Sequence, residues 1–264
     1  MNDLHVLLLQ TAPVWNDPDA SIAAAAELLQ KAETDGLLDG IDLIVLPEMW
    51  TTGFNVHEHA VLEEAHRGPG QRAMQKWAEQ WNCGVLGSLA VQTAEGQRHN
   101  RMFFVEPDGN GLHYDKRHLF TPGGESRSFV PGSTRTVVPW RGWNMLLQVC
   151  YDLRFPESSR NAPDNPYDLV VYAACWPTIR IQAWDILLQA RAIENAAFSV
   201  GVNSVMAARE PGGNSYPGHS SIYNYLGECL GAAEKCTPSY CRARLDKTAL
   251  QAYRTSFPVL QDMR

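Results

Sequence analysis

Three residues with reactive side chains follow apolar stretches in which strands are expected to end: Glu48, Lys116 and Cys150. A cysteine attacks a carbonyl carbon as its thiolate, so it needs a base that takes its proton. The oxyanion that then forms needs fixed positive donors, and a lysine ammonium together with a backbone N–H can supply them. A carboxylate, an ammonium and a thiol therefore suit a cysteine-based acyl transfer, provided that the fold brings them together.

Each of these residues also has an ordinary explanation when it is considered alone. Free cysteine is among the most buried residue types, so Cys150 could be a core residue. Glu48 and Lys116 could be solvated residues at the rim of a sheet. The three positions together are more informative, because the ends of neighbouring parallel strands converge in space. We therefore expect the three side chains to meet at one sheet edge.

The segment around Cys150 indicates how the thiol is positioned. Residues 144–149 form a short, mostly apolar run that is typical of a buried strand. Pro156 then stands where a helix can begin, because its fixed φ suits the first helical turn and its missing N–H is not needed there. A thiol between a strand end and a helix start has backbone N–H groups close to it.

The rest of the chain alternates between segments typical of strands and segments typical of helices. Strands are expected at residues 4–11, 42–47, 84–91, 101–106, 112–115, 136–140, 144–149, 167–174, 198–205, 220–225 and 240–245. Helices are expected at residues 21–31, 71–81, 178–197 and 246–255, and from residue 156. The strands are almost continuously apolar, which is typical of sheets covered by helices. No linker or repeat interrupts residues 1–264, so a single domain is the simplest expectation.

Composition and charge exclude several classes of function. The chain has 264 residues, 45% of them hydrophobic, which is enough for one large core. Its net charge of −7 argues against binding to nucleic acid or to an anionic membrane surface. No apolar run approaches the roughly 18 residues of a membrane-spanning helix, and the N-terminus is typical of a strand and not of a signal peptide.

The cysteines indicate a reducing compartment and no metal site. None of the six cysteines forms a Cys-x-x-Cys pair or has a histidine at zinc-ligand spacing. We therefore expect reduced thiols in a cytoplasmic protein. His57 and His59 form a His-x-His pair, but nothing nearby completes a metal site, so a solvated loop is expected there.

Three sequence blocks resemble the nitrilase superfamily of carbon–nitrogen hydrolases. The blocks are Leu-Pro-Glu48-Met, Tyr-Asp-Lys116-Arg-His-Leu-Phe and Val-Cys150-Tyr-Asp-Leu-Arg-Phe-Pro-Glu. Each block surrounds one member of the family's Glu-Lys-Cys triad, and the blocks follow the family's chain order. The resemblance extends from about residue 4 to residue 257. Within the superfamily, the second and third blocks are most similar to omega-amidases and their bacterial members.

The resemblance implies an α/β fold, a four-layer α-β-β-α sandwich in which two stacked mixed sheets are flanked by helices. It also implies a homodimer with helix packing on helix across the interface. The implied partners are a small amide substrate and water, and no cofactor is required.

The resemblance also implies a role for each residue of the site. Cys150 would be the nucleophile and Glu48 the general base, while Lys116 and the backbone N–H of Tyr151 would hold the oxyanion. Ammonia would leave to give a thioester, and a water molecule activated by Glu48 would release the acid. A second family glutamate matches Glu125, which would orient the lysine or the substrate amide.

Omega-amidases act on small 2-oxo acid amides such as 2-oxoglutaramate and 2-oxosuccinamate. These substrates carry a carboxylate, which a guanidinium group binds well. Arg154 and Arg180 are the candidates, although Arg154 could equally be a structural ion-pair partner and Arg180 an ordinary surface residue. The aromatic residues that could form the pocket wall are Phe54, Phe120, Tyr151 and Trp176.

Cys175 departs from the family pattern, because related bacterial sequences tend to have asparagine directly before this Trp-Pro pair. A thiol is a weak hydrogen-bond donor. Either the substrate differs from that of the relatives, or this position contributes little.

Two further kinds of function remain open at this stage. The same chemistry could act on deaminated glutathione, on an N-carbamoyl compound or on another small amide, and the triad alone does not exclude a nitrile. In a different class, the chain could be a catalytically idle binding or scaffold protein. The intact set of Glu48, Lys116 and Cys150 argues against that alternative.

Overall fold

The structure is a computed structural model that describes residues 3–57, 60–208 and 213–262. One mixed sheet contains β1 (Leu4–Gln10), β2 (Leu43–Val45), β3 (Glu63–Glu64), β4 (Gly84–Gln92), β5 (Arg98–Val105), β6 (Gly111–Asp115) and β15 (Ser239–Leu245). The other contains β7 (Val137–Trp140), β8 (Trp143–Val149), β9 (Leu169–Ala174), β10 (Phe198–Asn203), β13 (Ser221–Tyr223) and β14 (Cys229–Ala232). A short antiparallel pair is formed by β11 (Val205–Met206) and β12 (Tyr216–Pro217).

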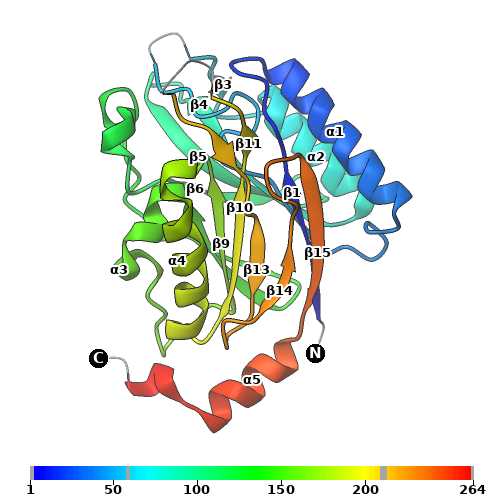
Figure 1. The fold of residues 1–264 in the computed structure, drawn as a ribbon, viewed down its shortest axis with the longest axis vertical. Helices are drawn as coiled ribbons and strands as arrows, with labels where there is room; N and C mark the ends of the chain where they lie inside the picture. The colour runs from blue at the N-terminus through cyan, green and yellow to red at the C-terminus, as the bar shows by residue number, and fades with distance from the viewer. Residues whose placement is uncertain (1–2, 58–59, 209–212, 263–264) are drawn as a thin grey trace.

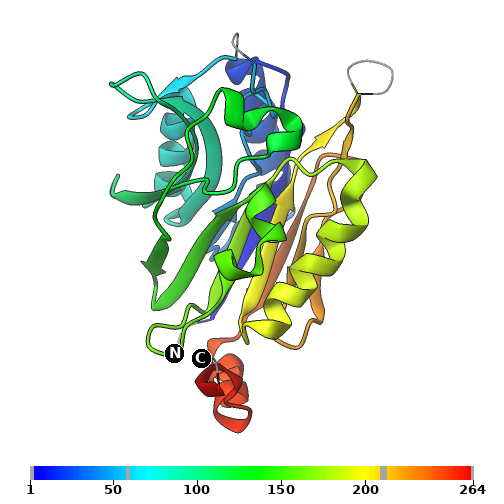
Figure 2. The same cartoon turned by 90° about the vertical axis from the view of Figure 1, so that its left-hand side faces the viewer.

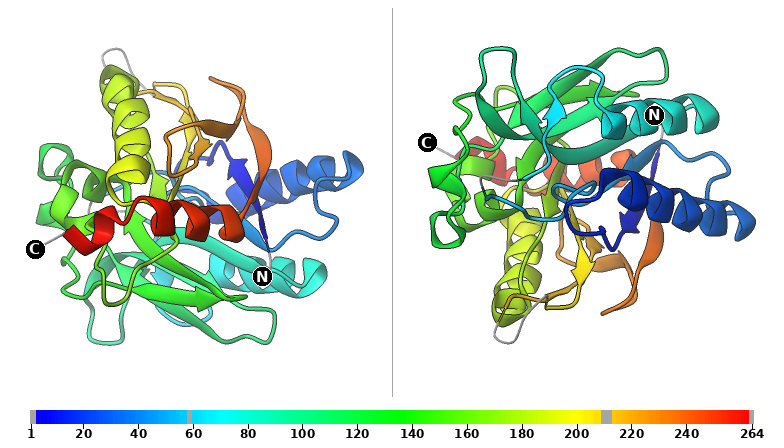
Figure 3. Two further views of the ribbon diagram at one scale, coloured as in Figure 1. Left: turned by 90° about the horizontal axis from the view of Figure 1, so that it is seen from below. Right: turned by 90° about the horizontal axis from the view of Figure 1, so that it is seen from above.

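Helices cover the outer face of each sheet (Figure 1). The helices are α1 (Pro18–Thr34), α2 (Pro69–Trp81), α3 (Pro156–Ser159), α4 (Ile181–Glu194) and α5 (Lys247–Ser256). In Figure 1, α1 and α2 lie on one side of the stacked sheets and α4 lies on the other. The α5 helix crosses one end of the sandwich (Figure 2, Figure 3). These four layers confirm the predicted α-β-β-α sandwich.

The continuous apolar strands are explained by burial on both faces. In β1, Val6 and Leu8 belong to the core between the sheets, whereas Leu7 and Leu9 belong to the core beneath α1 and α2. A strand with two buried faces has no polar alternation, which is why its sequence is an unbroken apolar run.

Close packing of α4 on the second sheet depends on a glycine in β10. A Cβ atom on Gly201 would lie 2.4 Å from Leu188 and 2.7 Å from Trp184, both of which are fully buried residues of α4. The glycine therefore lets the helix approach the strand closely. This contact holds α4 against the sheet that contains β8, the strand before Cys150.

The strands that precede Glu48, Lys116 and Cys150 belong to two different sheets. The first sheet has the order β15-β1-β2-β4-β5-β6, so β2 and β6 are not neighbours, and β8 belongs to the other sheet. The expectation that the three residues follow neighbouring strands of one sheet was therefore wrong. Since β5 is antiparallel to both β4 and β6, β6 runs in the same direction as β2, and their carboxyl ends share an edge. An apolar sequence pattern indicates that a strand is buried but does not identify the strands with which it pairs. The three residues still meet, because the two sheets stack with the carboxyl ends of β2, β6 and β8 at the same side.

The helix after Cys150 begins at Pro156 as predicted, but it is only one turn long. A 3-10 turn, η3 (Cys150–Arg154), lies between β8 and this helix and was not expected from the sequence. Similarly, the first residues of the long helix expected from residue 178 form a 3-10 turn, η4 (Thr178–Arg180), and α4 starts at Ile181. Within the described ranges, no helix has the length and apolar character needed to cross a membrane.

Candidate active site

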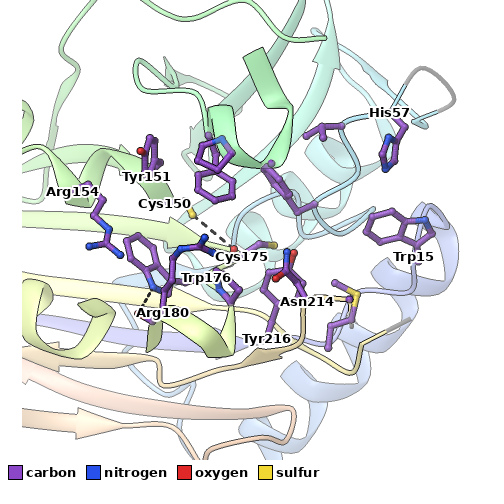
Figure 4. Close-up of a pocket in the computed structure, with 18 of the residues that line it drawn as sticks. Trp15, His57, Cys150, Tyr151, Arg154, Cys175, Trp176, Arg180, Asn214 and Tyr216 are labelled. Carbon is purple, nitrogen blue, oxygen red and sulfur yellow. Dashed lines mark hydrogen bonds between the residues drawn. The ribbon is translucent and has the colours of Figure 1, made fainter. Parts of the chain in front are cut away.

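A cavity of about 500 Å³ opens where β8 and β9 end (Figure 4). Cys150 directly follows β8 and Cys175 directly follows β9, and both line the cavity. The other cavity residues that the sequence had indicated are Phe54, Phe120, Tyr151, Arg154, Trp176 and Arg180. The structure thus places every predicted pocket residue around one cavity.

Three charged side chains meet in the protein interior beside this cavity. Lys116 Nζ donates hydrogen bonds to Glu48 Oε1 at 2.7 Å and to Glu125 Oε2 at 2.8 Å. All three side chains have no exposed surface. An ammonium carries three N–H donors, so these two bonds leave one N–H for another acceptor.

Glu48 is held in place by contacts from both sheets. Its Oε2 atom accepts a hydrogen bond from the backbone N–H of Cys175 at 2.8 Å. The next residue, Met49, has a φ of +43°, and its N–H donates to Ser88 Oγ at 3.0 Å. These contacts fix the direction of the carboxylate after β2 and leave it little freedom to rotate.

Cys150 occupies a sharp turn with an unusual backbone. Its φ is +45°, in the left-handed region, where a residue other than glycine costs roughly 1 kcal/mol or more. Asp152 stabilises this turn, because its Oδ2 atom accepts hydrogen bonds from the Val149 N–H at 2.9 Å and from the Tyr114 hydroxyl at 2.8 Å. The backbone N–H of His118 donates to the other Asp152 oxygen at 3.1 Å. One buried carboxylate thus joins the turn after β8 to the loop after β6, which carries the lysine.

The Cys150 thiol is neutral at rest. Burial raises its pKa well above the ordinary value, and the negative charge of Glu48 adds to this effect, while Lys116 partly opposes it. The Sγ atom lies 3.9 Å from the carbonyl oxygen of Cys175, which it can reach as a weak donor. A nucleophilic role of this thiol would therefore require a base, and the Glu48 carboxylate lies within hydrogen-bonding reach of it.

The lysine remains charged in spite of its burial. Burial by itself lowers the pKa of Lys116, but the charges of Glu125 and Glu48 outweigh it and raise the pKa well above the ordinary lysine value. For Glu125, burial raises the pKa, Lys116 opposes this, and the charge of Glu48 raises the pKa further. The cluster therefore provides a cation beside the thiol, held between two carboxylates.

Two residues of this network were missed by the sequence reasoning. Asn100 donates to Glu48 and to Glu125, and Asp152 organises the turn at Cys150. The strand expected at residues 101–106 in fact begins at Arg98, so Asn100 lies inside β5. An asparagine within an otherwise buried strand is a signal that could have identified it, because a buried amide needs partners.

The two candidate arginines lie at the rim of the cavity. The Arg180 guanidinium is 5.7 Å from the centre of the Phe120 ring, and that of Arg154 is 5.1 Å from the Trp176 ring. Arg180 is half-buried, whereas Arg154 is exposed. Neither forms an ion pair with an acidic residue in the described part of the chain. Both guanidinium groups are therefore free to bind an anionic ligand.

The Cys175 side chain is directed to the protein more than to the cavity. Its Sγ atom lies 3.2 Å from the carbonyl oxygen of Glu48 and 3.4 Å from the Ser204 hydroxyl. His57 is an exposed residue of the cavity lining, and His59 lies outside the described residues. Among the residues that the structure describes, no group of three or more His, Cys, Asp or Glu side chains could hold a metal ion.

Known proteins are similar to this chain over nearly its whole length. Residues 6–255 match the model of the carbon–nitrogen hydrolase family. The chain is 42% identical to the omega-amidase YafV of Yersinia enterocolitica over 99% of its own length and 97% of the relative. It is 30% identical to the 2-oxoglutaramate amidase of Bacillus subtilis, with 93% and 95% of the two chains covered. Its fold is similar to that of XC1258 from Xanthomonas campestris, a CN-hydrolase superfamily protein crystallised with an arsenic adduct in the active site (TM-score 0.91, 33% identity, 100% and 98% coverage).

Proposed function

The chain belongs to the carbon–nitrogen hydrolase family, and on this premise we propose that it is an omega-amidase that releases ammonia from small 2-oxo acid amides. The similarity to YafV and to 2-oxoglutaramate amidase supports this substrate class. The observation that carries the chemistry is the buried Lys116 bridge between Glu48 and Glu125 beside the Cys150 thiol. Burial of three charged side chains carries a large desolvation penalty, and a catalytically idle binding protein would not need such a cluster.

In the first step, Cys150 Sγ attacks the carbon of the substrate amide while Glu48 accepts the thiol proton. The carbonyl oxygen becomes an oxyanion, which the remaining N–H of Lys116 and the backbone N–H of Tyr151 bind. Such preorganised donors stabilise charge in the transition state because they do not have to reorient during the reaction. Glu125 holds the ammonium group in place from the other side.

In the second step, the tetrahedral intermediate collapses, and Glu48 returns the proton to the leaving nitrogen. Ammonia departs, and the acyl group remains on Cys150 as a thioester. A water molecule then attacks the thioester and gives its proton to Glu48. Collapse of this second intermediate releases the carboxylic acid and restores the thiol, so the net reaction consumes one amide and one water.

We assign the binding of the substrate carboxylate to Arg180. Its guanidinium is half-buried at the cavity and lies over Phe120, so binding of an anion there excludes more water than at the exposed Arg154. A guanidinium fork matches a carboxylate in geometry as well as charge. A 2-oxo acid amide would then lie between Arg180 at its acid end and Cys150 at its amide end.

We also propose that the protein is a cytoplasmic homodimer. The outer face of α4 exposes Ile186 (56%) and Ile193 (47%), and Leu226 in the turn beside it is 51% exposed. Clusters of exposed apolar side chains mark interaction surfaces, and this one suits packing of helix on helix. All six cysteines are free thiols, which fits a reducing compartment. Ile186→Glu combined with Ile193→Glu should give monomers in sedimentation velocity, and an unchanged dimer would place the interface elsewhere.

The assigned activity is tested by measuring ammonia release from a panel of compounds. The panel contains 2-oxoglutaramate, 2-oxosuccinamate, deaminated glutathione, N-carbamoyl amino acids and short nitriles, and Cys150→Ala is the blank. We expect turnover of the two 2-oxo acid amides at the highest kcat/KM and none in the variant. Turnover of carbamoyl compounds alone would overturn the omega-amidase assignment. A Cys150→Ala variant with full activity would overturn the cysteine mechanism.

A further inference from the structure

Asn100 contacts all three charged residues of the buried cluster. Its backbone carbonyl oxygen accepts a hydrogen bond from the N–H of Lys116 at 2.9 Å. Its side-chain Nδ2 donates to Glu48 Oε1 at 2.7 Å and to Glu125 Oε1 at 2.9 Å. The residue has no exposed surface, and both N–H groups of its side chain are taken up by the two carboxylates.

The orientation of the Asn100 amide is determined by its surroundings. The Ser88 hydroxyl oxygen accepts the N–H of Met49, so its own hydrogen is free to donate to Asn100 Oδ1, which is 2.7 Å away. The oxygen end of the amide therefore faces Ser88, and the NH2 end faces the two carboxylates. Each of its two N–H groups has one carboxylate as acceptor.

The Asn100 amide supplies a hydrogen-bond donor to one of the two Glu125 carboxylate oxygens. Glu125 Oε2 receives Lys116 Nζ and the backbone N–H of Phe120, at 2.8 Å and 2.6 Å. Glu125 Oε1, in contrast, has Asn100 as its hydrogen-bond donor within the described residues. Without this donor, a buried carboxylate oxygen would be left without a partner, which is expensive. Lys116 could satisfy this oxygen only by turning its third N–H inwards, away from the thiol.

We propose that Asn100 is a positioning residue that holds the Glu48 and Glu125 carboxylates in the orientation in which both bind Lys116, so that one lysine N–H remains available for the oxyanion. This role rests on the proposed amidase chemistry, because it is the oxyanion of that reaction that needs the third lysine N–H. Asn100 thereby maintains the base that Cys150 needs, without taking part in the reaction itself.

The test uses Asn100→Asp, which has almost the same shape, still accepts the Ser88 hydrogen and lacks both N–H donors. We expect kcat to fall roughly ten- to a hundredfold, as for loss of a hydrogen bond to a charged group, with little change in KM. The acidic limb of the kcat/KM profile should move to higher pH, because a third carboxyl group makes protonation of the cluster easier. An unchanged kcat and an unchanged acidic limb would overturn the proposal.

A second readout does not depend on the identity of the substrate. Alkylation of Cys150 by iodoacetamide reports how readily the thiol loses its proton, and we expect it to slow in Asn100→Asp by a factor similar to that in kcat. If the amide panel fails but alkylation slows in this way, the proposed function fails while the role of Asn100 stands. If the amides are turned over normally by this variant, the role of Asn100 fails while the proposed function stands.

The matched control is Asn195→Asp, at another asparagine without exposed surface. The Asn195 side chain donates to the carbonyl oxygen of Arg191 and to Glu194 and accepts the N–H of Asn161, and none of these partners belongs to the buried cluster. This variant should lose stability but keep the pH profile and the alkylation rate. The same changes in both variants would indicate a merely structural effect and overturn the proposal. If Asn100→Asp does not fold, Ser88→Ala removes the orienting hydroxyl, and an unchanged kcat and alkylation rate in it would overturn the proposal equally.

Discussion

Glu48, Lys116 and Glu125 have no exposed surface, whereas Arg154 and His57, which line the neighbouring cavity, are exposed. In the buried cluster, each charged side chain has partners of opposite charge or N–H donors at 2.6 to 2.9 Å. At the rim, the guanidinium groups lie over aromatic rings at 5.1 and 5.7 Å. The two regions thus differ in how strongly the protein constrains their side chains.

This difference suggests separate roles: the buried cluster performs the reaction, and the cavity rim selects the substrate. Removal of one partner from a buried ion pair leaves an uncompensated charge and costs about 3–5 kcal/mol, so the cluster tolerates little change. Contacts between a cation and an aromatic ring at an exposed site are worth about 0.5–1 kcal/mol. The rim can therefore change with the substrate, while the cluster performs the same reaction.

The largest effect is expected for Lys116→Ala. Loss of an oxyanion donor lowers kcat by a factor on the order of 100 to 1,000 in comparable sites. The variant also leaves two carboxylates facing each other, so its thermal midpoint should fall as well. Steady-state kinetics and thermal unfolding measure both effects. A variant within tenfold of the wild-type kcat would contradict the role of the cluster.

A smaller and selective effect is expected for Arg180→Ala. KM for 2-oxo acid amides should rise roughly ten- to a hundredfold, because the substrate carboxylate loses a charge-assisted hydrogen bond. A neutral amide of similar size should be affected little, since it has no carboxylate. Arg154→Ala is the matched control, with less than a threefold change expected. The reverse ranking of the two arginines would show that Arg154 binds the substrate.

The pH profile should have an acidic limb and no basic limb in the usual range. The pKa of Glu125 is raised by burial, so kcat/KM should fall about tenfold per pH unit below a limb that lies above pH 4.5. The pKa values of Cys150 and Lys116 are raised above 9.0 and 10.5, respectively, so the rate should remain constant up to about pH 9. A basic limb near pH 8 would mean that the thiol is not held neutral by the cluster.

The smallest effect is expected for Cys175→Ser. The contact that holds Glu48 comes from the backbone N–H of this residue, which the substitution retains. A neutral side-chain hydrogen bond has a small net value, so kcat and the substrate ranking should change by less than about threefold. Kinetics on two amides measure this. A changed substrate ranking would show that this departure from related sequences does select the substrate.

The fold was predicted correctly where a local sequence feature, such as apolar periodicity or a proline, directly determines the local structure. Strand β1 is apolar on both faces because both are buried, and Pro156 begins a helix because its φ suits that position. The 3-10 turn at Cys150 was not predicted, because it depends on Asp152, whose hydrogen-bond partners Tyr114 and His118 lie more than 30 residues away in the chain. The sequence near Cys150 does not indicate which distant residues will bind Asp152.

By itself, the sequence determined the identity of the reactive groups and the strand ends on which they stand, because residue type and apolar periodicity are local properties. Only the tertiary structure decided that Glu48 and Lys116 come from one sheet and Cys150 from the other, and that Asn100 lies between the two carboxylates. Strand pairing, sheet stacking and the sharing of hydrogen bonds depend on contacts between residues far apart in the chain. The charge state of the site follows from those contacts, because burial and neighbouring charges together set each pKa.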